Sequence, residues 1–226
     1  MTDSSLLIYN LGNQVEAFST RCNSVLPYTV LQPKQIHSDG IFVVKEKTRE
    51  SPIGYDALVT NLPNFAIGVR SADCIPVLLY DFRNKVIAAV HCGWRGTVLK
   101  LSEKVIKLMM LEYGSCPVNL KAVIGPGIGP ASFQVKTDVV RAFDNAGFSM
   151  DEILINKGTP SMPNYYVDLW KANRLTLENA GIISSNIFVS GICSFINHDE
   201  FYSARYLKNN KCGRTISSIM LIYNRK

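Results

Sequence analysis

Two histidines and one cysteine lie in three short segments that could form a binding site. His37 occurs in Gln-Ile-His-Ser, Cys74 in Ser-Ala-Asp-Cys-Ile-Pro, and His91 in Val-His-Cys-Gly-Trp-Arg-Gly-Thr, and the chain has only three histidines. One thiolate and two imidazoles are zinc ligands, and three protein ligands leave a fourth position open, as in catalytic zinc sites. We therefore expect a metal centre. The three residues are far apart in sequence, so an alternative has to be considered. In it, Cys74 is a small buried side chain and the histidines are polar groups whose hydrogen bonds are satisfied within the protein.

The expected site would carry a positive charge. Zinc with one thiolate leaves a formal charge of about +1, which suits an anionic or polarised substrate, and a zinc-bound water has a pKa of about 7. Asp73 precedes Cys74 and could orient a metal ligand or carry a proton. We therefore treat Asp73 and Cys74 as candidate catalytic residues.

The segment that begins with His91 is expected to join a strand to the start of a helix. Gly93 and Gly96 let the backbone approach a ligand, and the free N–H groups of a first helical turn attract anions. Arg95 offers a bidentate donor to phosphate or carboxylate, and Trp94 could stack on a planar base. In the alternative interpretation, Trp94 belongs to the core and Arg95 pairs with a surface acid.

Two further segments end in a hydroxyl and an arginine. Ser19 and Arg21 lie in one of them, and Arg205 closes Phe-Tyr-Ser-Ala-Arg in the other. Either could line an anion site, although each alone is also typical of ordinary surface. The Gly-Pro-rich stretch at 125–130 lacks the spacing of a P-loop, and His198 is expected in a loop and not as a ligand.

Composition limits the function classes. The 226 residues are 47% hydrophobic and 19% charged, with a net charge of +6, which predicts an ordered core and anionic partners. The basic residues are scattered and match no nucleic-acid-binding motif, so a small phosphate-bearing molecule fits as well as a polymer. The six cysteines are widely spaced, and neither a signal peptide nor an apolar run long enough to cross a membrane is visible. We expect a cytoplasmic protein without nucleic-acid or membrane partners.

The apolar pattern predicts an α+β fold with a mixed sheet, since strands and helices do not alternate regularly. One helix is expected after an N-cap at Thr97 and before Gly114, another over Thr137–Ala146, and a third from Asp168 to before Gly181. Strands are expected at Leu6–Tyr9, Val15–Ser19, Ile41–Val44, Ala57–Thr60, Phe65–Val69, Val77–Tyr80, Val86–Val90, Leu120–Ile124, Ile187–Ser190 and Ile216–Tyr223.

These segments together resemble the YfiH family, also called the laccase-domain, multicopper polyphenol oxidase or DUF152 family and now described as purine nucleoside phosphorylases. The resemblance runs nearly end to end, and the Ala-Asp-Cys and His-x-Gly-Trp-Arg-Gly blocks are its specific parts. The matching blocks are Phe18–Arg21, Gln35–His37, Tyr55–Thr60, Ala72–Val77, His91–Thr97, Ile124–Pro130, Asp168–Arg174, Phe201–Arg205 and Gly213–Arg214.

The resemblance implies one domain over residues 1–226, with packed mixed sheets flanked by helices, similar to bacterial cysteine-hydrolase-like toxins. It implies zinc at His37, Cys74 and His91, phosphorolysis of adenosine, inosine, guanosine and 5′-methylthioadenosine, and deamination of adenosine. Phosphate and nucleoside would then be the partners of a monomer or weak homodimer. Residues expected to contact substrate are Ser19, Arg21, Gln35, Trp94, Arg95 and Arg205, with Arg95 also catalytic.

Two other activities stay open for the resemblance. One is an amidase acting on a nucleotide-linked muramyl amino acid of a cell-wall precursor. The other is a copper-dependent polyphenol oxidase, against which the count of three histidines argues, because a multicopper site needs many more. A non-enzymatic nucleoside-binding protein is a further alternative.

Overall fold

The computed structural model describes residues 5–159, 161–208 and 212–223. Its centre is a six-stranded sheet in which β7 (Ile75–Asp81) and β8 (Val86–Cys92) are buried along their whole length. They form an antiparallel hairpin from two of the strands that the sequence predicts. The sheet has the order β13 (Ile187–Val189), β9 (Leu120–Ile124), β7, β8, β5 (Ala57–Thr60) and β4 (Ile41–Val43).

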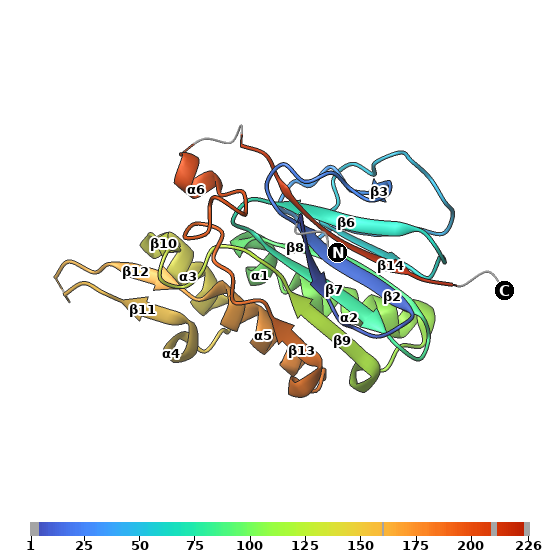
Figure 1. Ribbon diagram of the computed structural model, residues 1–226. Helices are drawn as coiled ribbons and strands as arrows, with labels where there is room; N and C mark the ends of the chain where they lie inside the picture. Colours follow the sequence, from blue (N-terminus) through green and yellow to red (C-terminus); the bar gives the residue numbers. More distant parts are fainter. Residues whose placement is uncertain (1–4, 160, 209–211, 224–226) are drawn as a thin grey trace.

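A five-stranded sheet packs face to face on the six-stranded one (Figure 1). Leu78 and Ile87 of the six-stranded sheet share a core cluster with Ile67 and Ile219 of the five-stranded sheet. Both sheets contain parallel and antiparallel pairs. The five-stranded sheet has the order β1 (Leu6–Tyr9), β2 (Val15–Thr20), β14 (Thr215–Leu221), β6 (Ala66–Ser71) and β3 (Val30–Leu31).

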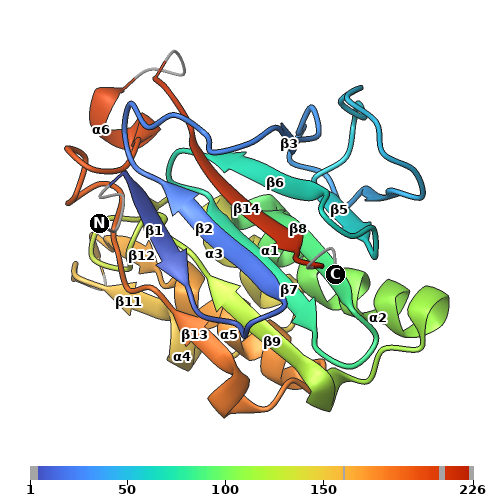
Figure 2. The same cartoon turned by 45° about the vertical axis from the view of Figure 1, so that its right-hand side comes forward.

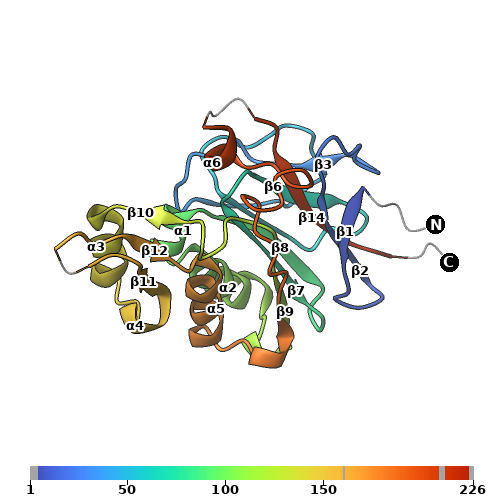
Figure 3. The same cartoon turned by 60° about the vertical axis from the view of Figure 1, so that its left-hand side comes forward.

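Helices cover the other face of the six-stranded sheet (Figure 3). Val77 and Val90 point to this side and pack in a second core cluster with Val105, Met109 and Leu177. Because both of its faces are covered, the central hairpin is a continuous apolar run instead of an alternating one. The helices on this side are α1 (Trp94–Val98), α2 (Leu101–Tyr113) and α5 (Leu169–Asn179).

A small sheet and two helices lie beside one end of the two larger sheets (Figure 2). The small sheet has the order β10 (Gln134–Val135), β12 (Tyr165–Val167) and β11 (Leu154–Asn156), next to α3 (Thr137–Asn145) and α4 (Met150–Ile153). The short helix α6 (Ala204–Leu207) precedes β14, and the 3₁₀ turns are η1 (Pro117–Asn119) and η2 (Ser184–Asn186). No helix in the described ranges is both long and apolar enough to cross a membrane.

The α+β architecture of mixed sheets flanked by helices is confirmed, and one helix start is corrected. Thr97 is not an N-cap: it lies inside α1, where its hydroxyl donates to the Gly93 carbonyl at 3.1 Å. A left-handed Lys100, with φ 54°, separates α1 from α2. Asp168 caps α5 as expected, accepting the Lys171 N–H at 2.9 Å.

Candidate metal centre and cleft

The three predicted metal ligands meet at one end of the two-sheet sandwich. Residues 72–74 carry the chain from β6 in one sheet to β7 in the other, and His91 lies near the end of β8 beside them. A cleft of about 910 Å³ opens at this point and is lined by His37, Cys74 and His91 among others. A cleft of this volume is of the size that takes small-molecule ligands.

The ligand atoms of His37, Cys74 and His91 all lie within 4.8 Å of one another. The Cys74 Sγ is 3.8 Å from His37 Nε2. A tetrahedral zinc ion with ordinary Zn–S and Zn–N bond lengths would place these two atoms about 3.6 Å apart. The donor set and its spacing therefore fit zinc, with the fourth direction toward the cleft.

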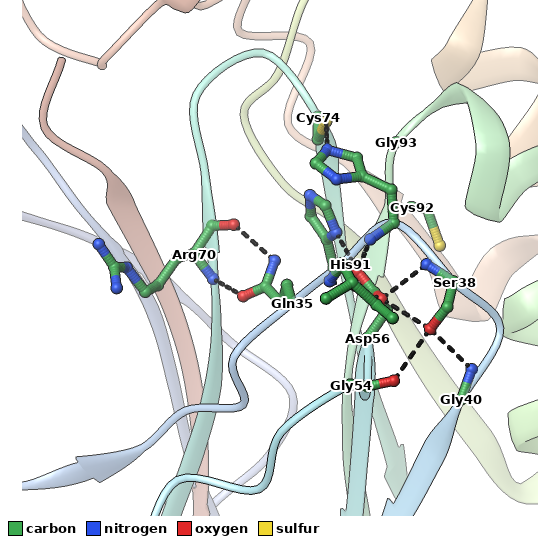
Figure 4. A network of polar contacts seen from close by, with 12 residues as sticks. Gln35, Ser38, Gly40, Gly54, Asp56, Arg70, Cys74, His91, Cys92 and Gly93 are labelled. Atoms are coloured by element: carbon green, nitrogen blue, oxygen red, sulfur yellow. Dashed lines mark hydrogen bonds and ion pairs between the residues drawn. The ribbon is translucent and has the colours of Figure 1, made fainter. Parts of the chain in front are cut away.

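Asp56, directly before β5, accepts hydrogen bonds from the Ser38 loop and from the ring of His91 (Figure 4). Its carboxylate accepts the backbone N–H groups of Ile36, His37 and Ser38 at 3.1, 3.0 and 2.7 Å. It also lies 2.8 Å from Nδ1 of His91, which leaves Nε2 of that ring for a metal. Three successive N–H groups can converge on one carboxylate because His37 is left-handed, with φ 61°.

The charges of the site are coupled. Burial opposes ionisation of Cys74, but the charge of His91 and a hydrogen bond with His37 outweigh it and lower the thiol pKa to about 6. Burial likewise opposes protonation of His91, but Cys74 and Asp56 outweigh it and raise its pKa to about 9. By contrast, burial raises the pKa of the neighbouring Cys92 thiol to about 12. Cys74 is therefore the thiol prepared to act as a thiolate.

Gly93 keeps space for this arrangement. A Cβ at this position would lie 2.8 Å from Cys74 Sγ and 3.3 Å from His37 Cδ2. The glycine has φ −62° and ψ 170°, a conformation open to any residue. Glycine is thus needed at position 93 because a side chain would collide with the Cys74 sulfur, and not because of the backbone conformation.

The Gly-Pro stretch at 125–130 supports the turn that carries Cys74. A Cβ on Gly127 would lie 2.5 Å from Ile75 Cδ1 and 2.9 Å from the Asp73 carbonyl oxygen. The Ile128 N–H donates to the same carbonyl at 2.8 Å. This loop is therefore a packing surface beneath the turn.

Gln35 lines the cleft, but its amide is bound to backbone. Its Nε2 donates to the Arg70 carbonyl at 2.9 Å, and its Oε1 accepts the Arg70 N–H at 2.8 Å (Figure 4). The amide pairs with β6 as a strand residue would, which holds the loop of His37 against that strand. The geometry gives Gln35 a positioning role, and the substrate contact expected for it stays a prediction.

Asp73 also lines the cleft, with φ 86° in the left-handed region. Its carboxylate accepts the Ser194 hydroxyl at 2.7 Å and the backbone N–H of Arg205 at 2.7 Å. It therefore ties two distant segments to the metal-site turn. The carboxylate that orients a metal ligand is Asp56 and not Asp73, which corrects one expectation from the sequence.

The other expected contacts divide into two groups. Trp94 and Arg205 line the cleft. Arg95 does not; its guanidinium stacks over the Trp94 ring at 4.2 Å. Ser19 is fully buried and hydrogen-bonded to the hydroxyls of Tyr9 and Ser217 at 2.7 and 2.6 Å, so it has no access to a ligand.

Arg21 and His198 lie outside the site. Arg21 pairs with Glu200 and lies over the Phe201 ring at 5.5 Å. The His198 ring stacks on Tyr206 with centroids 3.5 Å apart, in a loop as expected.

Sequence reasoning missed the role of Asp56 and most of the cations of the cleft. The one signal for Asp56 was an acid placed directly before a short, largely apolar strand, which is buried at every position. The missed cations come from three distant parts of the chain and no motif joins them; they are Lys34, Arg70, and the pair Lys208 and Arg214.

The chain is similar in sequence and in fold to several known proteins. Residues 12–222 match the family model described as multi-copper polyphenol oxidoreductase laccase. A purine nucleoside phosphorylase of Bacteroides thetaiotaomicron is 37% identical over 206 residues, covering 88% of this chain and 75% of its own length. The adenosine deaminase RL5 of an unknown prokaryotic organism is 37% identical over 198 residues, covering 84% and 74%. The crystal structure of the Bacillus licheniformis hypothetical protein YfiH superimposes with a TM-score of 0.87 at 25% identity, over 97% of both chains.

Proposed function

The chain belongs to the multi-copper polyphenol oxidoreductase laccase family, and we propose that it is a zinc-dependent purine nucleoside phosphorylase that also deaminates adenosine. Its nucleoside substrates would be adenosine, inosine, guanosine and 5′-methylthioadenosine. The relatives named purine nucleoside phosphorylase and adenosine deaminase support both activities. We also propose that it acts in the cytoplasm, where its six free cysteines would stay reduced.

The observation that carries the proposal is the three-ligand centre at the wall of a cleft. His37, Cys74 and His91 supply three ligands and leave one direction open. Zinc in this position would supply Lewis acidity at the open direction. Asp56 holds the His91 tautomer that leaves Nε2 unprotonated toward the metal.

The other residues of the cleft would bind and orient the substrates. We propose that Trp94 stacks on the purine, since it lines the cleft next to the ligands. In phosphorolysis, a phosphate oxygen bonds to C1′ of the ribose as the bond from C1′ to the base nitrogen breaks, giving ribose 1-phosphate and free base. In deamination, water adds at C6 of adenosine and ammonia leaves, giving inosine.

The family description names copper, but the residues fit a single-metal centre better. The chain has three histidines, of which His198 is stacked on Tyr206 away from the centre. A multicopper oxidase binds several copper ions largely through histidine. We therefore propose zinc, and the test below includes analysis of the metal.

The direct test compares the variant C74A with C116A, which removes an exposed cysteine distant in sequence from the ligands. Both proteins are analysed for metal and assayed with inosine plus phosphate and with adenosine alone. The proposal expects wild-type and C116A to carry about one zinc per chain and to release base only with phosphate. C74A should keep its fold and lose both activities. Full turnover by C74A would refute a role for the metal centre.

A further inference from the structure

The cleft is bordered by more positive charge than the metal site needs. Lys34 lies in the loop before His37, Arg70 lies on β6, Arg205 and Lys208 lie in or directly after α6, and Arg214 precedes β14. These residues come from three parts of the chain that are far apart in sequence, near residues 34, 70 and 205–214, and they line one cleft. Repulsion among such cations is unfavourable unless an anion binds between them.

The acid on the cleft wall does not neutralise this charge. Among the described residues, Asp73 is the one acidic side chain that lines the cleft, and its carboxylate is held by Ser194 and the Arg205 backbone N–H. Within the described part of the chain, neither Lys34 nor Arg70 has a carboxylate within ion-pair distance. Their charge is thus available to a ligand.

Two of the arginines are held in place by contacts to their backbone. The Gln35 amide clamps the N–H and C=O groups of Arg70, while the Arg70 guanidinium extends away from that amide (Figure 4). Asp73 accepts the N–H of Arg205, and the Arg205 guanidinium donates to the Gln134 carbonyl at 3.2 Å. Because the main chain beneath each arginine is already fixed, only side-chain rotamers have to be ordered when an anion binds.

We propose that Arg70 and Arg205 form the binding site for a phosphate oxyanion, and that inorganic phosphate occupies it as the second substrate of phosphorolysis. This inference rests on the function proposed above and moves phosphate from Arg95, which lies outside the cleft lining. Lys34 and Lys208 add charge at the rim. Phosphate held here attacks C1′, the base leaves with the electron pair of the broken bond, and solvent protonates it.

The same chemistry would recognise a phosphate carried by the substrate, as in a nucleoside 5′-monophosphate. The two sources differ in what saturates the site. If free phosphate is the second substrate, the phosphate KM depends on Arg70, and phosphorolysis of adenosine and phosphorolysis of AMP are affected alike. A substrate-borne phosphate predicts that Arg70 matters for AMP and not for free phosphate.

The test uses R70Q, because the Arg70 side chain makes no hydrogen bond or ion pair in the described structure and its loss should leave the fold intact. R205Q is the second variant, and R141Q, an exposed arginine on α3, is the matched control. The readouts are the phosphate KM for phosphorolysis of inosine, adenosine and AMP, the kinetics of adenosine deamination, which needs no phosphate, and binding of orthophosphate followed by ³¹P NMR.

The proposal expects the phosphate KM to rise about tenfold or more in R70Q and R205Q, since charge-assisted bonds are lost. R141Q should resemble wild type in both reactions, and in R70Q the phosphate KM should rise by a larger factor than the adenosine KM of deamination does. An unchanged phosphate KM in R70Q, or a change confined to AMP, overturns the proposal.

The measurement of orthophosphate binding distinguishes a failure of the proposed anion site from a failure of the proposed reaction. If wild-type protein catalyses no phosphorolysis yet binds orthophosphate, and R70Q does not, the anion site stands while the reaction fails. If wild-type protein binds no orthophosphate at millimolar concentration and R70Q leaves phosphorolysis unchanged, the site itself is refuted.

Discussion

Replacing Asp56 by Asn should weaken both the fold and the metal centre, because one carboxylate serves five donors. Oδ2 accepts the N–H groups of Ile36 and Ser38 and the Ser38 hydroxyl, and Oδ1 accepts from the His37 N–H and His91 Nδ1. The amide introduced by D56N can present an oxygen on only one of these two sides. If its NH₂ replaces Oδ2, two backbone N–H groups lose their acceptor. A fully buried unsatisfied donor costs about 1–3 kcal/mol; because these two N–H groups are part-buried, this orientation costs at most about 2–6 kcal/mol of stability.

The other orientation of the amide in D56N would damage the metal centre instead. An NH₂ in place of Oδ1 donates to His91 Nδ1 and shifts the ring proton to Nε2, the nitrogen needed for the metal. Loss of such an outer contact costs about 10–100-fold in metal affinity. Either orientation therefore lowers stability or zinc binding.

The assay combines urea unfolding of the metal-free proteins with zinc affinity measured by chelator competition. The matched control is D39N, which changes a carboxylate in the same loop that is half exposed and pairs with Lys104 at 2.5 Å. Such a surface pair is worth about 0–1 kcal/mol. If D56N matches D39N in both unfolding free energy and zinc affinity, the role assigned to Asp56 is refuted.

Two further predictions concern the same centre. G93A should lower both zinc affinity and the free energy of unfolding, because the new methyl would crowd the Cys74 sulfur at 2.8 Å. In a C74A background, where that sulfur is absent, G93A should change the free energy of unfolding little. An equal loss of unfolding free energy in both backgrounds would contradict a steric cause. Zinc affinity should also depend on pH. With the pKa of Cys74 near 6 and that of His91 near 9, the metal-free site between these values holds a thiolate and a protonated imidazole, so zinc displaces one proton. Because the metal-free state binds one more proton than the zinc-bound state, zinc affinity rises about tenfold per pH unit between pH 6 and 9. Below pH 6 the Cys74 thiol is also protonated, so the dependence is steeper there. Zinc competition titrations from pH 5 to 9 test this, and a flat profile between pH 6 and 9 would contradict the coupling.

The strands and the three metal-site residues could be predicted because they depend on local pattern and on rare residue types. The apolar runs of β7 and β8 mark strands covered on both faces. Two of only three histidines and one cysteine lie at the ends of strands or in tight loops, where chemistry is common. The helix after the metal segment was placed too late, since the break at Lys100 is a single left-handed residue with no sequence signal.

The roles of polar side chains could not be predicted, because they depend on which distant segments become neighbours. Gln35 was assigned to substrate, yet its amide meets the backbone of Arg70, 35 positions away. Ser19 ends a strand in a pattern that suits an anion site, but the pairing of β2 with β14 buries it against Ser217. Asp56 acquires its role only when the loop of His37 folds over it.

The central claim, that one metal held by His37, Cys74 and His91 supports nucleoside phosphorolysis, is tested most directly by zinc reconstitution. Protein stripped with a chelator is titrated with zinc while bound metal, free base and ribose 1-phosphate are followed with inosine and phosphate. The account predicts that activity is absent without metal, rises in proportion to bound zinc and reaches its plateau at about one zinc per chain. Undiminished activity in the stripped protein, or zinc-loaded protein that forms no ribose 1-phosphate, would contradict it.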